Sequence, residues 1–267
     1  FMPRFAFNYL AGERTIIRGG IGKFSGGSPN VWVSNTYTND GLTIVNFNRS
    51  SISDSSVYLT NVNGFDIPQA VQDTLQQGNG SANYMDPNFK IPSAWKFNIA
   101  VQHEFDLGET MGDGYIVTAE VLHTEQSDST TWVDAGLEKV GSTMDGRPLY
   151  ALKSGGQHDL GVTNIAGGKS TVFALSLQKE FDNGVDFSVS YAFTDSTDVN
   201  PGTSSTADSN FGKFATSDVQ SPIEATSNYE IRHRIVAKLN YRTEFIDDLE
   251  SRFSLLFTTE SGRPFSY

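Results

Sequence analysis

The feature that most constrains the fold of this chain is a strict alternation of apolar and polar residues. In residues 95–105, Trp, Phe, Ile, Val, His and Phe occupy every second position, and Lys, Asn, Ala, Gln and Glu fill the positions between them. Residues 185–194 and 231–242 repeat the pattern. Because successive side chains of a β-strand point to opposite faces, these segments predict strands with one apolar and one polar face.

Strands of this kind are expected in pairs that are joined by short turns. The expected strands are residues 3–9, 14–24, 94–106, 115–125, 171–181, 185–195, 230–245 and 251–260. The turn Asp182-Asn183-Gly184 contains Asn-Gly, the strongest short hairpin signal. We expect the strands to pair in sequence order as antiparallel neighbours.

The connections between the hairpins are long. They cover about residues 25–91, 126–170 and 196–229 and are rich in Ser, Thr, Asn, Asp and Gly. Asp66 is expected to cap a short helix at 67–77 in the first of them. Connections this long are uncommon in compact soluble domains, whereas outer-membrane barrels combine short periplasmic turns with long extracellular loops.

The predicted fold is therefore all-β: an antiparallel transmembrane β-barrel segment of about eight strands, occupying residues 1–267. Aromatic residues near the strand ends, such as Trp95 and Phe181, fit interfacial girdles, although aromatics also simply favour strands. The residues expected to face lipid are Phe97, Ile99, Val101, Phe187, Val189, Tyr191, Ile235 and Leu239. Those expected to face the lumen are Asn98, Gln102, Ser188, Arg234 and Lys238.

Composition excludes several other classes of protein. No run of 18 apolar residues is present, so a membrane-spanning helix is not expected. A mean hydropathy of -0.32 fits a soluble protein and a barrel equally well. The net charge of -12 argues against nucleic acid as a partner, and the lack of cysteine excludes disulfides and thiolate metal sites.

Motifs for catalysis, cofactors or metals are weak. Gly168-Lys169-Ser170-Thr171 resembles the end of a phosphate-binding loop, but Thr163 stands where the first glycine is required. The histidines are far apart and show no paired metal spacing. We therefore predict no enzymatic activity, no cofactor and no metal site, while divalent cations at the acidic loop residues remain an alternative to simple solvation.

Aromatic residues in the long polar loops are the candidates for ligand contact. Such side chains suit the capture of carbohydrate or peptide, but they can equally form small cores that keep the loops folded. The candidate ligand-contact residues are Trp32, Tyr37, Tyr84, Trp132, His158, Phe211 and Phe214.

Several stretches, taken in order, resemble the barrel of TonB-dependent outer-membrane receptors of the Oar-like group. The most specific are EIRHRI at 230–235 and SGRPFS at 261–266. The others are PRFAFNY at 3–9, RTIIRGGIGKF at 14–24, VWVSN at 31–35, IPSAWKF at 91–97, QKEFDNG at 178–184 and SYAFT at 190–194. The likeness covers nearly the whole chain and is weakest inside the loops.

The resemblance implies residence in the bacterial outer membrane and a share in a larger barrel of the 22-stranded type. It implies uptake of a large substrate, of siderophore, oligosaccharide or peptide class, with inner-membrane energy. Implied partners are outer-membrane lipid and lipopolysaccharide, the remaining barrel and plug of the same receptor, and a TonB-type energy-coupling protein. Plug and TonB box are absent from these residues, so a C-terminal-half fragment is expected.

Two alternatives remain open at this point. One is a structural or adhesive surface protein that uses the barrel only as an anchor, and the other is a secreted β-sandwich that binds carbohydrate. The fragment hypothesis makes a distinct geometric prediction, because a sheet edge in hydrocarbon leaves backbone groups unpaired. The strands at 3–9 and 251–260 should lie far apart and should not pair with each other.

Overall fold

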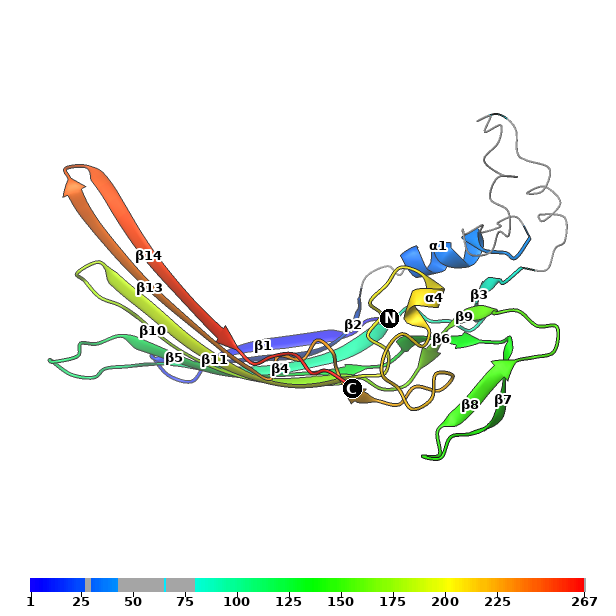
Figure 1. Cartoon of the computed structure of the whole chain (residues 1–267). Coiled ribbons are helices and arrows are strands. Elements are labelled where there is room, and N and C mark those ends of the chain that lie inside the picture. The colour runs from blue at the N-terminus through cyan, green and yellow to red at the C-terminus, as the bar shows by residue number, and fades with distance from the viewer. Residues whose placement is uncertain (27–29, 43–64, 66–79, 267) are drawn as a thin grey trace.

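The computed structural model describes residues 1–26, 30–42, 65 and 80–266, so the helix expected at 67–77 lies outside the described residues. One antiparallel sheet dominates the molecule, and its long strands pair in sequence order, as predicted (Figure 1). They are β1 (Arg4–Leu10), β2 (Thr15–Ser25), β4 (Ser93–Phe105), β5 (Tyr115–Gln126), β10 (Lys169–Glu180), β11 (Val185–Asp198), β13 (His233–Ile246) and β14 (Leu249–Glu260). The short β12 (Ala225–Thr226) pairs with the end of β11.

The sheet is curved and open. β1 and β14 form its two edges, and neither pairs with the other. Figure 1 shows the hairpin of β13 and β14 rising steeply from the rest of the sheet, with the hairpin turns at one end and the long loops at the other. The expectation that the first and last strands do not pair with each other is confirmed.

One strand begins later than expected. The segment 230–245 was predicted as a strand from its first residue, but β13 starts at His233. Glu230 instead lies buried beside the end of β11, where its carboxylate accepts hydrogen bonds from Ser196 N (2.7 Å) and Arg232 Nε (2.9 Å). These bonds hold the preceding segment in a turn.

The two faces of the sheet differ as the alternation predicts. On one face a continuous row runs across the strands from β2 to β14: Ile17, Val101, Ala119, Leu175, Tyr191, Ile235 and Thr259. Ile99 on this face is 38% exposed, whereas its neighbour Ala100 on the other face is 1% exposed. The polar side chains of Asp186, Lys238 and Asn240 line a hollow in the curved sheet, so the polar face is the concave one and the apolar face is the exposed convex one.

Aromatic rings gather near the hairpin turns of the central strands. Phe105 and Tyr115 stack at 5.7 Å between ring centroids, and Phe181 and Phe187 lie 6.2 Å apart. Lys179 Nζ lies 5.2 Å from the centroid of the Phe181 ring. An aromatic cluster spanning four neighbouring strands is the arrangement expected of an interfacial girdle.

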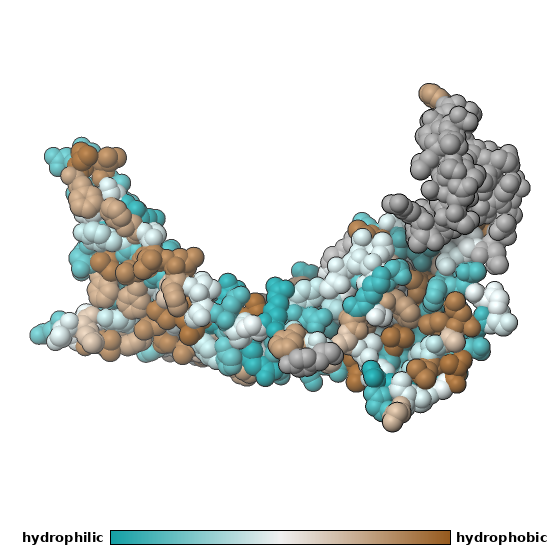
Figure 2. Space-filling view, in the orientation of Figure 1, coloured by the Kyte–Doolittle hydropathy of each residue, from teal (hydrophilic) through white to brown (hydrophobic). Residues whose placement is uncertain are grey.

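The apolar belt ends before the strands do. On the convex face Trp95 of β4 lies opposite Glu125 of β5, and Glu125 lies opposite Lys169 of β10. Charged residues therefore appear at the loop end of the apolar belt. About nine residues at roughly 3.3 Å each, tilted by about 40°, span somewhat more than 20 Å, close to the apolar band of outer-membrane barrels. In Figure 2 the hydrophobic colour gathers over the turn side of the strands, and a hydrophilic zone separates it from the loop region.

The hairpin expected at Asp182-Asn183-Gly184 is confirmed, in a three-residue form. Gly184 N donates to Phe181 O (3.2 Å), Phe181 N donates to Val185 O (2.8 Å), and Gly184 has a positive φ of 84°. This combination is a tight turn followed by a left-handed glycine bulge. The glycine is required because a Cβ atom there would lie 2.1 Å from Arg242 O.

The long loops carry structure that periodicity did not predict. They contain α1 (Asn30–Thr38), β3 (Asn83–Met85), β6 (Ser129–Asp134), β7 (Leu137–Ser142), β8 (Pro148–Leu152), β9 (Leu160–Ile165) and α4 (Ala207–Asn210). β3, β9 and β6 form one small sheet, and β7 and β8 form a ribbon. These elements gather into one loop domain at the end of the barrel sheet (Figure 1).

Candidate functional site

The loop domain has a small hydrophobic core. Trp132, Leu160, Val162 and Ala207 are buried in it, and Trp32, Met85, Phe89 and Phe211 pack against them. These residues come from all three long loops. The core thus joins segments that are far apart in the sequence into one body above the sheet.

Trp32 and Trp132, both candidates for ligand contact, meet in this core. Their rings pack edge to face at 5.1 Å, and Trp32 Nε1 donates to Ser204 O (2.8 Å). Trp132 is 2% exposed, so packing accounts for it. Phe211, a third candidate, contacts the same core. The alternative of small loop cores therefore describes these three side chains.

The remaining candidates lie outside that cluster. Tyr37 on α1 is 76% exposed, and Phe214 is half-buried beyond α4. Tyr84 on β3 lies against Gly161, where a Cβ would come within 2.2 Å of its ring. Burial, and then the nearby carboxylate of Asp134, raise the pKa of Tyr84. Their role in ligand contact stays a prediction.

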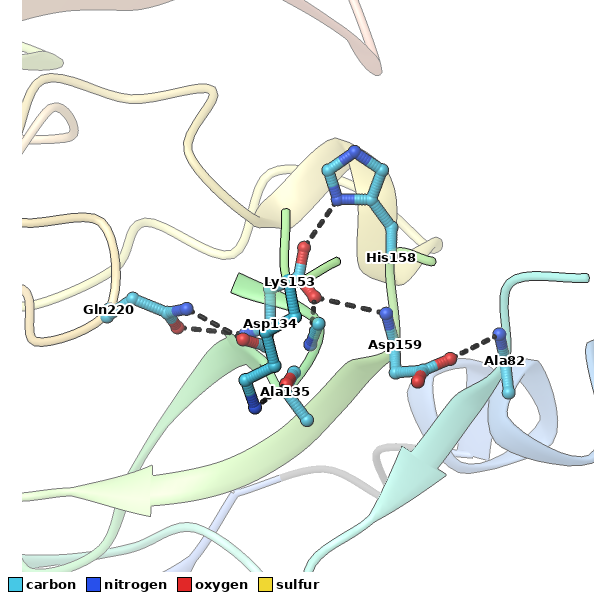
Figure 3. Close-up of polar contacts among 8 residues, drawn as sticks. Ala82, Asp134, Ala135, Lys153, His158, Asp159 and Gln220 are labelled. Carbon is cyan, nitrogen blue, oxygen red and sulfur yellow. Dashed lines mark hydrogen bonds and ion pairs between the residues drawn. The ribbon is translucent and has the colours of Figure 1, made fainter. Parts of the chain in front are cut away.

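His158, the last candidate, belongs to a polar brace around Asp134 (Figure 3). The Asp134 carboxylate is fully buried and accepts hydrogen bonds from Gly136 N (2.9 Å), Asp159 N (3.0 Å) and His158 Nδ1 (2.6 Å). Gln220 bonds both backbone groups of Asp134, at 2.9 and 2.7 Å. Asp134 therefore ties the second long loop to the third.

Asp159 extends this brace to the first long loop. Its carboxylate accepts a hydrogen bond from Ala82 N at 3.0 Å (Figure 3). A second tie uses Asn35 on α1, whose side-chain oxygen accepts from Ala207 N (2.8 Å) and Asn83 Nδ2 (3.0 Å). The loop domain is thus held by buried polar bonds as well as by its core, which gives a site built on it a defined shape.

A cavity of about 750 Å³ lies where the loop domain meets the sheet. Its loop side includes Trp32, Ser129, Thr130 and the segment 200–205. Its sheet side is formed by the ends of β5, β10 and β11, with Thr124, Gln126, Ser170, Ser196 and Asp198. This volume falls in the usual range of small-molecule sites.

The sheet side of the cavity is a lateral row of hydroxyl groups. Thr124 on β5 is opposite Ser170 on β10, and Ser170 is opposite Ser196 on β11. All three lie on the concave face, with neighbouring strands about 4.8 Å apart. The sequence did not single out this row, because a serine at the end of a polar strand face looks like any solvated residue.

A second, smaller hollow of about 580 Å³ lies on the concave face nearer the turns. Glu180 pairs with Arg242, and Asn240 Nδ2 donates to Asp186 Oδ1 (2.5 Å). Lys238 and Arg252 also line it. Fixed charges of both signs therefore cover this part of the concave wall.

The three histidines on strands have hydroxyl partners. His103 Nδ1 lies 2.9 Å from Thr15 Oγ1, and His123 Nδ1 lies 2.8 Å from Thr171 Oγ1. His233 Nδ1 lies 2.8 Å from the hydroxyl of Tyr191. Each pair joins neighbouring strands on the convex face. Local hydrogen bonding accounts for these imidazoles near the borders of an apolar belt.

Within the described part of the chain, no group of three or more His, Asp or Glu side chains is arranged to hold a metal ion. No helix among the described residues is long and apolar enough to cross a membrane.

A curved antiparallel sheet with an exposed apolar belt, a charged concave face and long loops at one end defines the wall of an outer-membrane barrel. Comparison with family models bears this out, because residues 1–266 match the outer membrane beta barrel domain. The chain belongs to this family and resides in the bacterial outer membrane. No curated protein matches the chain.

Proposed function

We propose that this chain forms part of the barrel wall of a TonB-dependent outer-membrane transporter of the Oar-like group. The observation that carries the proposal is the open, curved sheet with a charged concave face. A closed eight-stranded barrel is just wide enough for side chains to fill its interior. A face carrying Lys238, Arg242, Arg252, Glu180 and Asp186 suits a wider lumen that holds water or a polar plug.

The open edges support the same proposal. In hydrocarbon each unpaired backbone group costs several kcal/mol, so a spanning sheet must close. β1 and β14 each have one partner among the described strands. Further strands of the same receptor would complete the barrel, and a plug in its lumen would contact the charged concave face.

The proposed partners follow from this role. The convex belt contacts outer-membrane lipid, and the strand ends beyond it contact lipopolysaccharide. A TonB-type protein acts on the plug and supplies inner-membrane energy for uptake. The barrel itself then binds and conducts its substrate without chemical change, so the chain is not an enzyme.

The test uses the full-length protein in its own outer membrane. In-cell photo-crosslinking is expected to capture a TonB-type protein on the periplasmic side. In planar bilayers the purified protein should be closed, and mild urea, which unfolds a plug before a barrel, should open a large conductance. A structural or adhesive anchor would give neither the crosslink nor the conductance, and that pair of results would overturn the proposal.

A further inference from the structure

We infer that the cavity between the loop domain and the ends of β5, β10 and β11 binds a neutral, polyhydroxylated ligand, an oligosaccharide. The inference rests on the proposed function in that it names the substrate class of the transporter. Three properties of the cavity support it: a lining of mostly neutral polar groups, polar side chains without protein partners, and the regular spacing of hydroxyls on the sheet.

The cavity is rich in neutral hydrogen-bonding groups. Hydroxyl side chains supply much of its lining, among them Thr124, Thr130, Ser170, Ser196 and Ser204. Its charged side chains are Lys169, which lies 4.0 Å from Glu224, and Asp198. An anionic ligand would require a cluster of unpaired cations, which the lining lacks. Hydroxyls both donate and accept, and so match sugar hydroxyls.

Several of these groups have no protein partner among the described residues. The side chains of Thr124, Gln126, Ser170 and Ser196 make no hydrogen bond in the structure described. Thr130 Oγ1 is buried without a partner. Asn200 and Ser204, in contrast, bond within the loops and shape the opposite wall. Free donors and acceptors therefore line both walls of the cavity, and those on the strand side come from β5, β10 and β11.

The free hydroxyls form a line rather than a cluster. Thr124, Ser170 and Ser196 succeed one another across three strands at the spacing of a sheet, about 4.8 Å. That step is close to the length of one pyranose unit, so successive sugars of a linear chain can each meet one hydroxyl. The partly exposed Trp32 at the loop side adds an apolar surface of the kind that sugar C–H groups contact.

The test is binding of short neutral cello-, malto- and xylo-oligosaccharides to the full-length protein in detergent, measured by calorimetry and by tryptophan fluorescence. At least one series should bind, and more tightly than neutral peptides of similar length or anionic oligogalacturonides. Ser170→Ala should weaken binding about five- to tenfold, because the variant loses the hydrogen bond between the Ser170 hydroxyl and the sugar. Ser170→Trp should abolish it by filling the cavity.

The matched control is Ser176→Ala, on the same strand and the same concave face but outside the cavity. It should leave binding unchanged. The inference is overturned if no neutral oligosaccharide binds, if peptides or anionic glycans bind more tightly, or if Ser170→Trp binds like Ser176→Ala. Binding in detergent needs no energy source, so oligosaccharide binding without a TonB crosslink would contradict the proposed function and leave the inference standing.

Discussion

Single residues decide the local geometry at the turns and inside the loops. The turn at position 184 accepts only glycine, for two reasons. Its φ is 84°, and Arg242 O occupies the place where a Cβ atom would lie. Asp134 has a similar local role in the loop domain. Its buried carboxylate accepts hydrogen bonds from two backbone N–H groups and from His158. Both residues fix the conformation of the backbone and not the packing of apolar side chains, so substitutions there test the turn and the brace directly.

Gly184→Ala is expected to destabilise the hairpin of β10 and β11. The strained φ costs about 1 kcal/mol, and the clash with Arg242 O forces the backbone to move, for a total of roughly 2–4 kcal/mol. The measurement is urea unfolding of the protein in detergent or lipid. Gly108→Ala serves as control, because its φ is also positive but a Cβ there meets nothing within 4 Å. Equal midpoints for the two variants would contradict the clash.

Asp134→Ala is expected to loosen the loop domain and spare the sheet. Removing the carboxylate leaves buried N–H groups of Gly136 and Asp159 without partners, at a cost of about 1–3 kcal/mol each. Limited proteolysis should cut residues 126–170 faster, while the strands stay protected. Asp145→Ala, in the exposed turn between β7 and β8, should show little change. Equal cleavage of the two variants would argue against the brace.

Each long strand presents one face to an apolar environment and the other to a polar one. Along each long strand the apolar side chains of the convex face alternate with polar ones of the concave face, and the pairing register keeps every row in line. The residues predicted to face lipid share the convex face, and those predicted to face the lumen share the concave one.

Spin labels can test the lipid-facing assignment one residue at a time. Labels at Ile99 and Val189, on the convex face, should be relaxed by a lipid-soluble quencher. Labels at their neighbours Asn98 and Ser188 should instead respond to a water-soluble quencher, because a one-residue step reverses the face. Labels at 99 and 189 that are shielded from lipid would contradict the assignment.

The loop domain is expected to weaken in acid. Asp86 accepts hydrogen bonds from Asn88 N (2.8 Å) and Thr163 Oγ1 (2.7 Å), and these, the backbone bond first, lower its pKa. A lowered folded-state pKa means that the stabilisation is present above the ordinary pKa and is lost as pH falls through the folded value. Protease sensitivity of the loops should therefore rise below about pH 4.

Asp86→Asn is the matched variant for this pH dependence. Its amide oxygen can keep the bond from Asn88 N, and its amide NH₂ can donate to the Thr163 hydroxyl instead, but neither group titrates. The variant should be somewhat more sensitive than the parent at neutral pH, and its sensitivity should change less on acidification. Identical pH profiles for the two proteins would remove Asp86 as a cause.

At the scale of the whole molecule, the open sheet is the decisive feature. Its edges β1 and β14 do not pair with each other, although each presents a row of backbone groups along one side. In a membrane the edges of such a sheet must pair with further strands, and the charged concave face must contact water or a polar plug. The alternative, in which β1 and β14 pair with each other and close a small barrel, can be tested directly.

Engineered cysteines provide that exclusion, because the chain has none of its own. A pair at Ala237 and Phe257, opposite each other on β13 and β14, should form a disulfide under oxidation. A pair at Phe7 and Phe257, on the two edge strands, should not crosslink within the chain. A disulfide between positions 7 and 257 would mean that the sheet closes into a small barrel, and the transporter proposal would lose most of its support.

The sequence by itself determined the sheet. Alternation around Ile99, Val189 and Ile235 defines two faces whatever the neighbours, and a turn such as Asp182-Asn183-Gly184 makes consecutive strands pair. These are local effects of backbone geometry, so a single chain displays them. The order of the strands and the apolar face follow from them, and the contrast between short turns at one end and long polar loops at the other adds the membrane location.

Only the tertiary structure decided the loop domain and the cavity. Loop aromatics carry no period, so the sequence left open whether Trp32, Trp132 and Phe211 contact a ligand or pack together. Contacts between three distant loops place Trp132 in a core and Trp32 and Phe211 against it. Asp134 is held by partners that lie up to 86 residues away, and the row of Thr124, Ser170 and Ser196 forms only when adjacent strands pair. Such long-range contacts leave no periodic signal, so they appear only when the chain is folded.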